Sequence, residues 1–222
     1  MLDGDRKADV AIIGGGFTGI SAALHLAEAG ATVVLLEANA PGWGASGRNG
    51  GFCCLGGSMA TEQALTRRFG QAAAEAYWQA EEDAVSLVAE LLTRFAIQAD
   101  VHSKGETQLA HRPRDMDRLR RKADEMAQGS GPDPILTEPG DLLREGFGGP
   151  FHGALTTPVG FGLNPRKYLF GIAAAAVKAG AALMQDSAVT GLERTGAGWQ
   201  LRTRHGTVAA AQVLLATNGY SS

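Results

Sequence analysis

Residues 8–37 read ADVAIIGGGFTGISAALHLAEAGATVVLLE, and they contain the clearest structural pattern in the chain. Ala8–Ile13 is a short apolar run rich in β-branched residues, which is typical of a buried parallel strand. Apolar residues then recur at helical spacing over Ile20–Ala29, and Gly30 is a natural stop for that helix. Thr32–Leu36 is a second apolar strand. The segment therefore predicts a strand–turn–helix–strand (βαβ) unit.

The turn of this unit carries the pattern Gly14-x-Gly16-x-x-Gly19, and an acid, Glu37, ends the second strand. Gly14 would permit the sharp turn, Gly16 would let backbone approach a pyrophosphate, and Gly19 would let helix and strand pack closely. The pyrophosphate would bind at the helix N-terminus, and Glu37 would accept hydrogen bonds from the adenosine ribose. The alternative is an ordinary turn followed by a surface glutamate. The complete context favours a dinucleotide site.

A long glycine-rich segment from Pro41 to Gly57 distinguishes between the two common dinucleotides. A loop of this length without periodicity is usually functional in a compact domain. An NAD-binding unit would continue promptly to another helix and strand, whereas this chain inserts WGASGRNGG at residues 43–51. Such a segment allows close backbone approach to a flavin, so the sequence predicts FAD as the cofactor.

The overall composition excludes several other classes of function. The net charge is −3 and charged residues make up 19% of the 222 residues, which does not fit a polyanion-binding surface. No apolar run approaches the roughly 18 residues that span a bilayer. The two cysteines, Cys53 and Cys54, are adjacent and cannot link distant segments. We therefore predict a cytoplasmic protein with no nucleic-acid partner and no membrane span.

The rest of the chain alternates helical and strand-like patterns. Thr61–Phe95 is helical by its apolar stripe, with a break at Gly70. Asp100–His111 predicts a hairpin, and residues 113–128 predict a charged helix. Asn164 and Pro165 would open a helix that runs to Ala179. Further strands are predicted at residues 151–158, 182–185, 188–194, 199–204, 207–210 and 213–216.

Three segments of the chain resemble the D-amino-acid oxidase-like (DAO) family of FAD-dependent oxidoreductases: residues 14–19, residues 43–51 and the stretch LATNGY at 215–220. The resemblance is strongest to the γ-glutamylputrescine oxidase type of amine oxidase. It runs in order through the whole chain and covers the N-terminal half of such proteins. By this resemblance the cofactor-binding residues are Gly14, Gly16, Phe17, Thr18, Gly19, Glu37, Ala38, Ser46, Arg48, Asn49, Gly50, Gly51, Val189, Ala216, Thr217 and Asn218.

The resemblance also implies an architecture and an activity. The expected fold is α/β, with a Rossmann-like FAD-binding domain of the glutathione-reductase type at residues 1–97 and 159–222. Residues 98–158 would begin a mixed-sheet α+β substrate-binding domain. The implied reaction oxidises a C–N bond of an amine or amino acid by hydride transfer to flavin, and electrons pass to O₂ or another acceptor. Because family members are about twice as long, we expect either a missing C-terminal half or a homo-oligomer to complete the site.

Several residues leave alternatives open. Arg48 could stabilise a reduced, anionic flavin, clamp a phosphate or be a solvated loop residue. Cys53 and Cys54 could react with flavin or form a redox pair, although two small buried residues are the simpler interpretation. The five histidines are scattered, so no metal site is predicted, and no catalytic residue is named. The rival functions are a catalytically inactive FAD-binding fragment and a hydroxylating or RNA-modifying flavoprotein.

Overall fold

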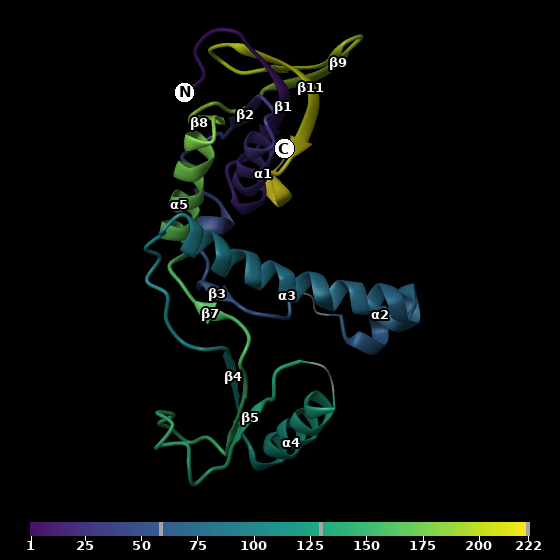
Figure 1. Cartoon of the computed structure of the whole chain (residues 1–222), viewed down its shortest axis with the longest axis vertical. Coiled ribbons are helices and arrows are strands. Elements are labelled where there is room, and N and C mark those ends of the chain that lie inside the picture. The colour runs from purple at the N-terminus through teal and green to yellow at the C-terminus, as the bar shows by residue number, and fades with distance from the viewer. Residues whose placement is uncertain (58–59, 129–130, 221–222) are drawn as a thin grey trace. The chain divides into compact units, whose positions relative to one another are not determined.

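The computed structural model describes residues 1–57, 60–128 and 131–220 of the chain (Figure 1). Its contacts divide the chain into two compact units. The first comprises Met1–Gly51, Glu90–Asp100 and Leu163–Ser222, and the second comprises Phe52–Ala89 and Val101–Gly162. The sequence-based division instead kept residues 52–89 with the first unit. The difference arises because these residues make their contacts with residues 101–162, through strand pairing that the sequence pattern does not reveal.

A six-stranded sheet forms the centre of the first unit. Four parallel strands are followed by an antiparallel pair at one edge, as the α/β prediction requires. In spatial order the strands are β8 (Ala182–Met184), β2 (Val33–Leu36), β1 (Arg6–Ile13), β11 (Thr207–Leu215), β10 (Gly198–Arg202) and β9 (Gly191–Thr195).

The register of this sheet brings three distant segments to one edge. Ile13 pairs with Leu36 on one side and with Leu215 on the other, so the residues that follow each strand emerge together. The two strands predicted at residues 207–210 and 213–216 are one strand, β11. The ladder with β1 continues through Gln212, which pairs with Val10, and so the exposed residues between the two apolar runs do not interrupt it.

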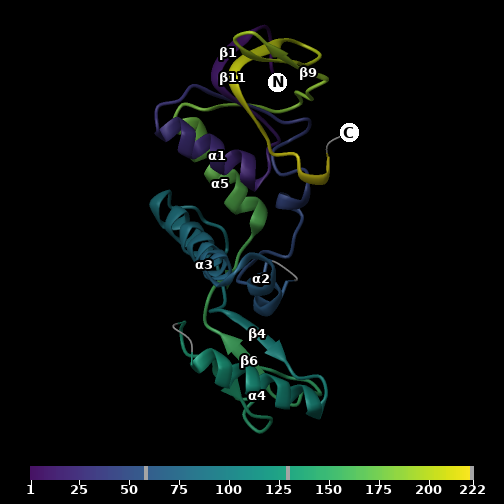
Figure 2. The same cartoon turned by 90° about the vertical axis from the view of Figure 1, so that its right-hand side faces the viewer.

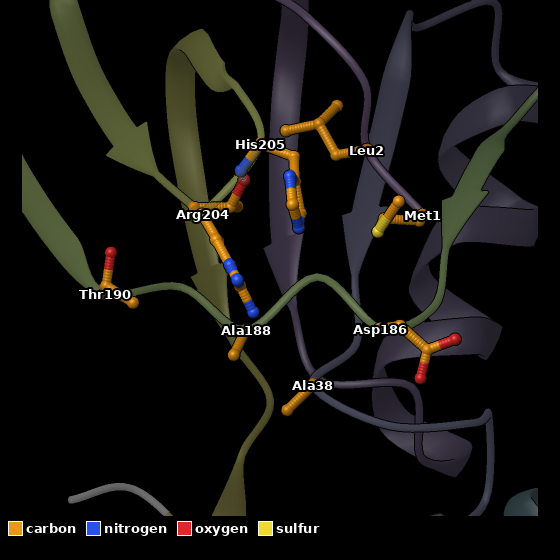
Figure 3. Close-up of a pocket in the computed structure, with 9 residues that line it drawn as sticks. Met1, Leu2, Ala38, Asp186, Ala188, Thr190, Arg204 and His205 are labelled. Atoms are coloured by element: carbon orange, nitrogen blue, oxygen red, sulfur yellow. Dashed lines mark hydrogen bonds between the residues drawn. The ribbon is translucent and has the colours of Figure 1, made fainter.

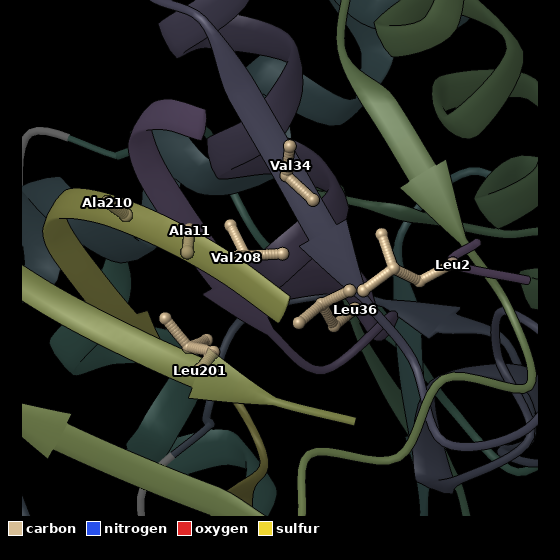
Figure 4. Packing of buried hydrophobic residues seen from close by; sticks show 7 residues of the cluster. All are labelled: Leu2, Ala11, Val34, Leu36, Leu201, Val208 and Ala210. Atoms are coloured by element: carbon tan, nitrogen blue, oxygen red, sulfur yellow. The ribbon is translucent and has the colours of Figure 1, made fainter. Parts of the chain in front are cut away.

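Helices cover one face of the sheet, and the N-terminal segment packs on the other. Helices α1 (Phe17–Glu28) and α5 (Pro165–Lys178) lie side by side (Figure 2). Asn164 caps α5 by accepting the Lys167 N–H at 3.1 Å, as predicted. On the other face Leu2 is fully buried, and its N–H donates to the Ser187 hydroxyl at 2.8 Å. The cluster shown in Figure 4 comprises Leu2, Ala11, Val34, Leu36, Leu201, Val208 and Ala210.

Among the residues that the structure describes, the second unit contains two small antiparallel sheets and three helices. Strands β4 (Glu106–Leu109), β6 (Ala154–Thr157) and β5 (Ile135–Thr137) form one sheet, with β6 in the middle. Helix α4 (Pro113–Ala127) packs on it through Met116 and Leu119. The remaining elements are β3 (Phe52–Cys53) paired with β7 (Phe161–Gly162), α2 (Glu62–Phe69), and α3 (Gln71–Arg94), which extends into the first unit.

The hairpin predicted at residues 100–111 is wrong. Strand β4 pairs with β6, almost fifty residues further along the chain, and the preceding segment makes an isolated bridge between His102 and Gly162. Gly105 adopts a positive φ of 89° and donates its N–H to the Gly160 carbonyl at 2.8 Å. The turn therefore directs β4 to a distant partner instead of folding it back on residues 100–103.

Candidate functional site

The glycine turn after β1 has no room for side chains at the three patterned positions. A Cβ at Gly14, whose φ is +115°, would overlap the Ala216 carbonyl oxygen, and a Cβ at Gly19 would overlap the Gly14 carbonyl oxygen. A Cβ at Gly16 would lie 2.9 Å from the Ser46 hydroxyl. The turn thus requires glycine at the first position for backbone conformation and packing and at the third for packing against backbone, whereas a Cβ at Gly16 would displace the Ser46 side chain.

The N-terminus of α1 is the natural place for an anion in this turn. The first N–H groups of an α-helix have no partner within the helix, and they carry its positive dipole end. Ser46, from the following glycine-rich loop, accepts the Phe17 N–H at 3.0 Å. Because a hydroxyl that accepts one hydrogen bond can still donate another, Ser46 can offer its proton to a phosphate oxygen beside the N–H of Thr18.

Glu37 holds the glycine turn with its carboxylate. One oxygen accepts the Gly15 N–H at 2.6 Å, and the other accepts the Asn39 N–H at 2.8 Å. The sequence predicted only ribose hydroxyls as its partners. An ionised carboxylate has about four acceptor positions, so two bonds to the protein leave capacity for two hydroxyls of a ligand. Glu37 can therefore fix the turn and bind a ribose at the same time.

Asn49 shapes the glycine-rich loop from within. Its amide nitrogen donates to the Ala45 and Ser46 carbonyls at 3.1 and 3.0 Å, and its amide oxygen accepts the Gly51 N–H at 2.8 Å. The family resemblance predicts Asn49 as a cofactor-binding residue. In the structure its polar atoms already make hydrogen bonds within the loop, and two of these bonds stabilise the short 3₁₀ turn Ala45–Gly47.

Arg48 packs on an aromatic pair in the same unit. Its guanidinium lies 4.6 Å from the centre of the Trp43 ring, and Trp43 meets Tyr220 edge-on with ring centres 6.1 Å apart. Tyr220 belongs to the 3₁₀ turn Asn218–Tyr220 that follows β11. Arg48 therefore makes a cation–π contact with Trp43, and Trp43 in turn contacts the turn that follows β11. None of the predicted roles of Arg48 included this contact.

Two backbone hydrogen bonds attach the glycine-rich loop and the end of β11 to the same turn. The Gly42 N–H donates to the Gly15 carbonyl at 2.9 Å, and the Ala216 N–H donates to the Ile13 carbonyl at 2.8 Å. At the far end of the loop, the Gly51 carbonyl accepts the Leu163 N–H at 2.9 Å. Most predicted site residues thus come together at the carboxyl edge of β1, β2 and β11: residues 14–19, 37–38, 46–51 and 216–218.

A cavity of about 430 Å³ lies next to Ala38 in this unit (Figure 3). The predicted residue Val189 packs its side chain against the buried cluster, while its neighbours Ala188 and Thr190 line the cavity. Arg204 and His205 also line it, and neither is predicted from the sequence because no motif surrounds them. The complete lining is Met1, Leu2, Ala38, Asp186, Ala188, Thr190, Thr203, Arg204 and His205.

Comparisons with known proteins agree with this geometry. The sequence profile of the family described as DAO, FAD dependent oxidoreductase, matches residues 9–222. The chain belongs to the DAO family. This membership confirms the predicted family and the predicted cofactor, FAD. The family is one of FAD-dependent oxidoreductases, which is the class of enzyme that the sequence predicts.

Curated DAO relatives are similar over almost all of this chain. A probable oxidoreductase, OrdL, of Haemophilus influenzae is 31% identical over 97% of the chain and 50% of its own length. The gamma-glutamylputrescine oxidoreductase of Escherichia coli is 31% identical over 99% of the chain and 51% of its own length. The chain therefore spans about half the length of these relatives.

Solved structures confirm the fold class. Glycine oxidase from Geobacillus kaustophilus is 25% identical, with a TM-score of 0.75 over 95% of this chain and 55% of that one. L-Amino acid deaminase from Proteus myxofaciens is 20% identical, with a TM-score of 0.76 over 97% of this chain and 46% of that one. Both support the α/β FAD-binding architecture of the DAO family.

The second unit places Cys53 and Cys54 just after the glycine-rich loop. Both are half-buried and not disulfide-bonded. Burial, followed by the neighbouring Cys54, raises the pKa of the Cys53 thiol. Burial also raises the pKa of Cys54, and the carboxylates of Glu106 and Glu81 raise it further. Both groups are therefore poor thiolate nucleophiles at neutral pH, which favours a packing role over flavin or redox chemistry.

Glu81 on α3 fixes the backbone that follows the cysteines. Its carboxylate accepts the Gly56 and Gly57 N–H groups at 3.0 Å each and the Tyr77 hydroxyl at 2.6 Å. Partial burial alone would raise the pKa of Glu81, but these three hydrogen bonds outweigh burial and lower it. We therefore expect the carboxylate to hold this glycine pair near neutral pH.

Glu81→Gln should speed amide hydrogen exchange at Gly56 and Gly57 by about tenfold, since bonds to a charged acceptor contribute roughly 1.5–3 kcal/mol. A carboxylate whose pKa is lower in the folded state than in the unfolded state stabilises the fold at pH values above its ordinary pKa. This contribution disappears as the pH falls through the pKa of the folded state. The wild-type protection of both amides, corrected for intrinsic exchange, should fall over that acidic interval. Glu82→Gln on the same helix is the control, and equal exchange in the two variants would contradict this role for Glu81.

Two broader properties concern the described residues 1–57, 60–128 and 131–220 alone. None of their helices is long and apolar enough to cross a membrane. Within the same residues, no three His, Cys, Asp or Glu side chains are grouped so that they could hold a metal ion.

Proposed function

We propose that this chain forms the FAD-binding part of a DAO-family enzyme that oxidises a C–N bond of an amine or amino acid. The observation that carries the proposal is the cradle formed by the glycine turn, Ser46 and Glu37 at one edge of the sheet. The names of the relatives support the substrate class. One is a gamma-glutamylputrescine oxidoreductase, and a structural neighbour is a glycine oxidase.

The residues present fit FAD in three respects. The N–H groups at the start of α1, together with the Ser46 hydroxyl, would hold the pyrophosphate. Glu37 would accept hydrogen bonds from the ribose with the acceptor positions that the protein leaves open. The glycine-rich loop ending at Gly50 and Gly51 would allow the flavin to approach backbone. When bound, FAD supplies the two-electron acceptor for substrate oxidation.

The protein's own contribution to the reaction would be positioning and charge. Arg48, held on Trp43, would provide a fixed positive charge beside a cofactor that becomes anionic on reduction. Residues 1–97 and 159–222 would bind FAD, and residues 98–158 would face the substrate. No catalytic residue is assigned, because an amine that is already deprotonated needs orientation over the ring more than a base. O₂ or another acceptor would receive the electrons, and the cytoplasmic location stays a prediction.

Reconstitution with excess FAD tests the cofactor part of the proposal. After removal of free cofactor, the protein should keep a flavin absorption spectrum and melt at a higher temperature. A colourless protein whose melting temperature does not depend on FAD would contradict it. NAD in place of FAD is the control ligand and should not raise the melting temperature.

Substrate oxidation requires a separate experiment. The FAD-loaded protein is incubated with a panel of amines and amino acids, in air and without oxygen, and bleaching of the flavin spectrum is followed. Anaerobic bleaching by one class of amine would support the proposed reaction. Bound FAD that no amine reduces would favour the rival prediction, an FAD-binding chain without turnover of its own.

A further inference from the structure

The cavity beside Ala38 lies next to the proposed cofactor site. Ala38 directly follows Glu37, the proposed ribose ligand, and Ala188 lies near it in Figure 3, on the segment between Asp186 and Thr190 that also lines the cavity. Both side chains are single methyl groups, so they leave a smooth apolar surface between them. A flat heteroaromatic ring attached to a ribose at Glu37 would enter this cavity next.

Arg204 reaches over this surface from the turn between β10 and β11. The turn is fixed because Gly206 accepts the Thr203 N–H at 2.9 Å and the Thr203 hydroxyl at 2.9 Å. The Gly4 N–H also donates to the His205 carbonyl at 3.0 Å. In Figure 3 the Arg204 side chain extends down toward Ala188, with its guanidinium directed into the cavity.

The Arg204 guanidinium differs from that of Arg202 in having no acidic partner. Arg202 pairs with Glu193 at 2.6 Å, whereas Arg204 has no ion pair among the residues that the structure describes. A guanidinium without a carboxylate is free to stack, because it is planar, delocalised and less strongly hydrated than an ammonium group. Its position over an apolar surface next to a ribose site favours an aromatic ligand.

We propose that Arg204 stacks on the adenine ring of FAD and holds the adenosine end of the cofactor in this cavity. The inference rests on the proposed function, because it needs Glu37 to bind the ribose. It assigns to Arg204 a binding role that the glycine pattern, the acid and the loop do not include. The ligand group in this contact is the uncharged adenine ring. The contact therefore requires the planar guanidinium, and a positive charge alone is not sufficient.

The test measures binding of FAD and of ADP, which carries the adenosine and pyrophosphate groups without the flavin, to the full chain by isothermal titration calorimetry. Arg204→Ala should weaken both ligands by about tenfold, the size of a partly desolvated cation–π contact. Arg204→Lys keeps the charge but loses the plane, and it should recover little of this loss. Arg202→Ala removes the same charge from the same hairpin and should bind both ligands like the wild type.

The possible results separate this inference from the proposed function. If the wild type binds FAD and ADP but Arg204→Ala binds them equally well, the stacking role is wrong and the proposed function stands. If Arg204→Lys binds ADP like the wild type, the contact is electrostatic and the stacking role is again overturned. If the wild type binds neither ligand, both proposals fail. Melting curves of each variant check that the hairpin change leaves the fold intact.

Discussion

Gly14→Ala is expected to lower the free energy of unfolding by about 2–6 kcal/mol and to prevent retention of FAD. Two effects combine at this position. Gly14 has a φ of +115°, which a residue with a Cβ adopts only with strain, and the added Cβ would overlap the Ala216 carbonyl oxygen. That carbonyl lies at the end of β11 and moves only if the parallel ladder with β1 moves. Urea unfolding and flavin absorbance after reconstitution would measure the two losses.

Gly30→Ala is the matched control for this change. Gly30 also has a positive φ, of +88°, but a Cβ there would meet nothing within 4 Å. It should therefore show the strain of the backbone conformation without the collision, with a cost of about 1 kcal/mol and normal FAD binding. Equal destabilisation by the two substitutions would show that the Ala216 carbonyl does not limit the space at Gly14.

Glu37→Gln is expected to weaken FAD binding by about 10- to 100-fold, because hydrogen bonds to a charged acceptor contribute roughly 1.5–3 kcal/mol. Gly15 and Asn39 donate to different oxygens of the carboxylate, and the amide replaces one of these oxygens by an NH₂ group, so one of the two N–H groups loses its acceptor. The amide also has less acceptor capacity for ribose hydroxyls. Fluorescence titration of FAD against the variant measures the loss.

Asp9→Asn separates the cofactor effect from the structural one. Asp9, in β1, accepts the Thr32 N–H at 2.7 Å, so it is also a carboxylate bonded to backbone, but the N–H that it accepts precedes β2, whereas Glu37 follows β2. Both variants should lose some stability, and only Glu37→Gln should lose affinity for FAD. Wild-type affinity in Glu37→Gln would mean that the acid serves the glycine turn alone.

The sequence predicted the parts of the site that depend on local pattern. The glycine spacing, the acid after the second strand and the cap at Asn164 each follow from neighbours within a few residues, and the structure contains the predicted turn and cap. Pairing over long distances was not predictable in the same way. The alternation at residues 106–109 indicates a strand but does not identify β6 as its partner.

The same distinction applies to side chains in the glycine-rich loop. The contact of Asn49 with the cofactor stays a prediction, and the structure adds three hydrogen bonds within the loop that no sequence pattern indicated, because only the folded conformation shows which carbonyls Asn49 reaches. The sequence around Arg204 contains no pattern that indicates a binding role, since a single arginine in a hairpin turn is common. Its position over the cavity depends on where the β10–β11 turn lies in the folded sheet.

The burial of Leu2 has a practical consequence for protein production. Because its side chain is fully enclosed and its N–H is bonded to Ser187, the chain leaves the core only at Met1, which lines the cavity next to Ala38. An affinity tag fused directly before Met1 would start beside the space where we place adenine, and it would compete with the cofactor during purification. A cleavable tag with a long flexible spacer, removed before flavin is added, avoids an artefact that would resemble weak cofactor affinity.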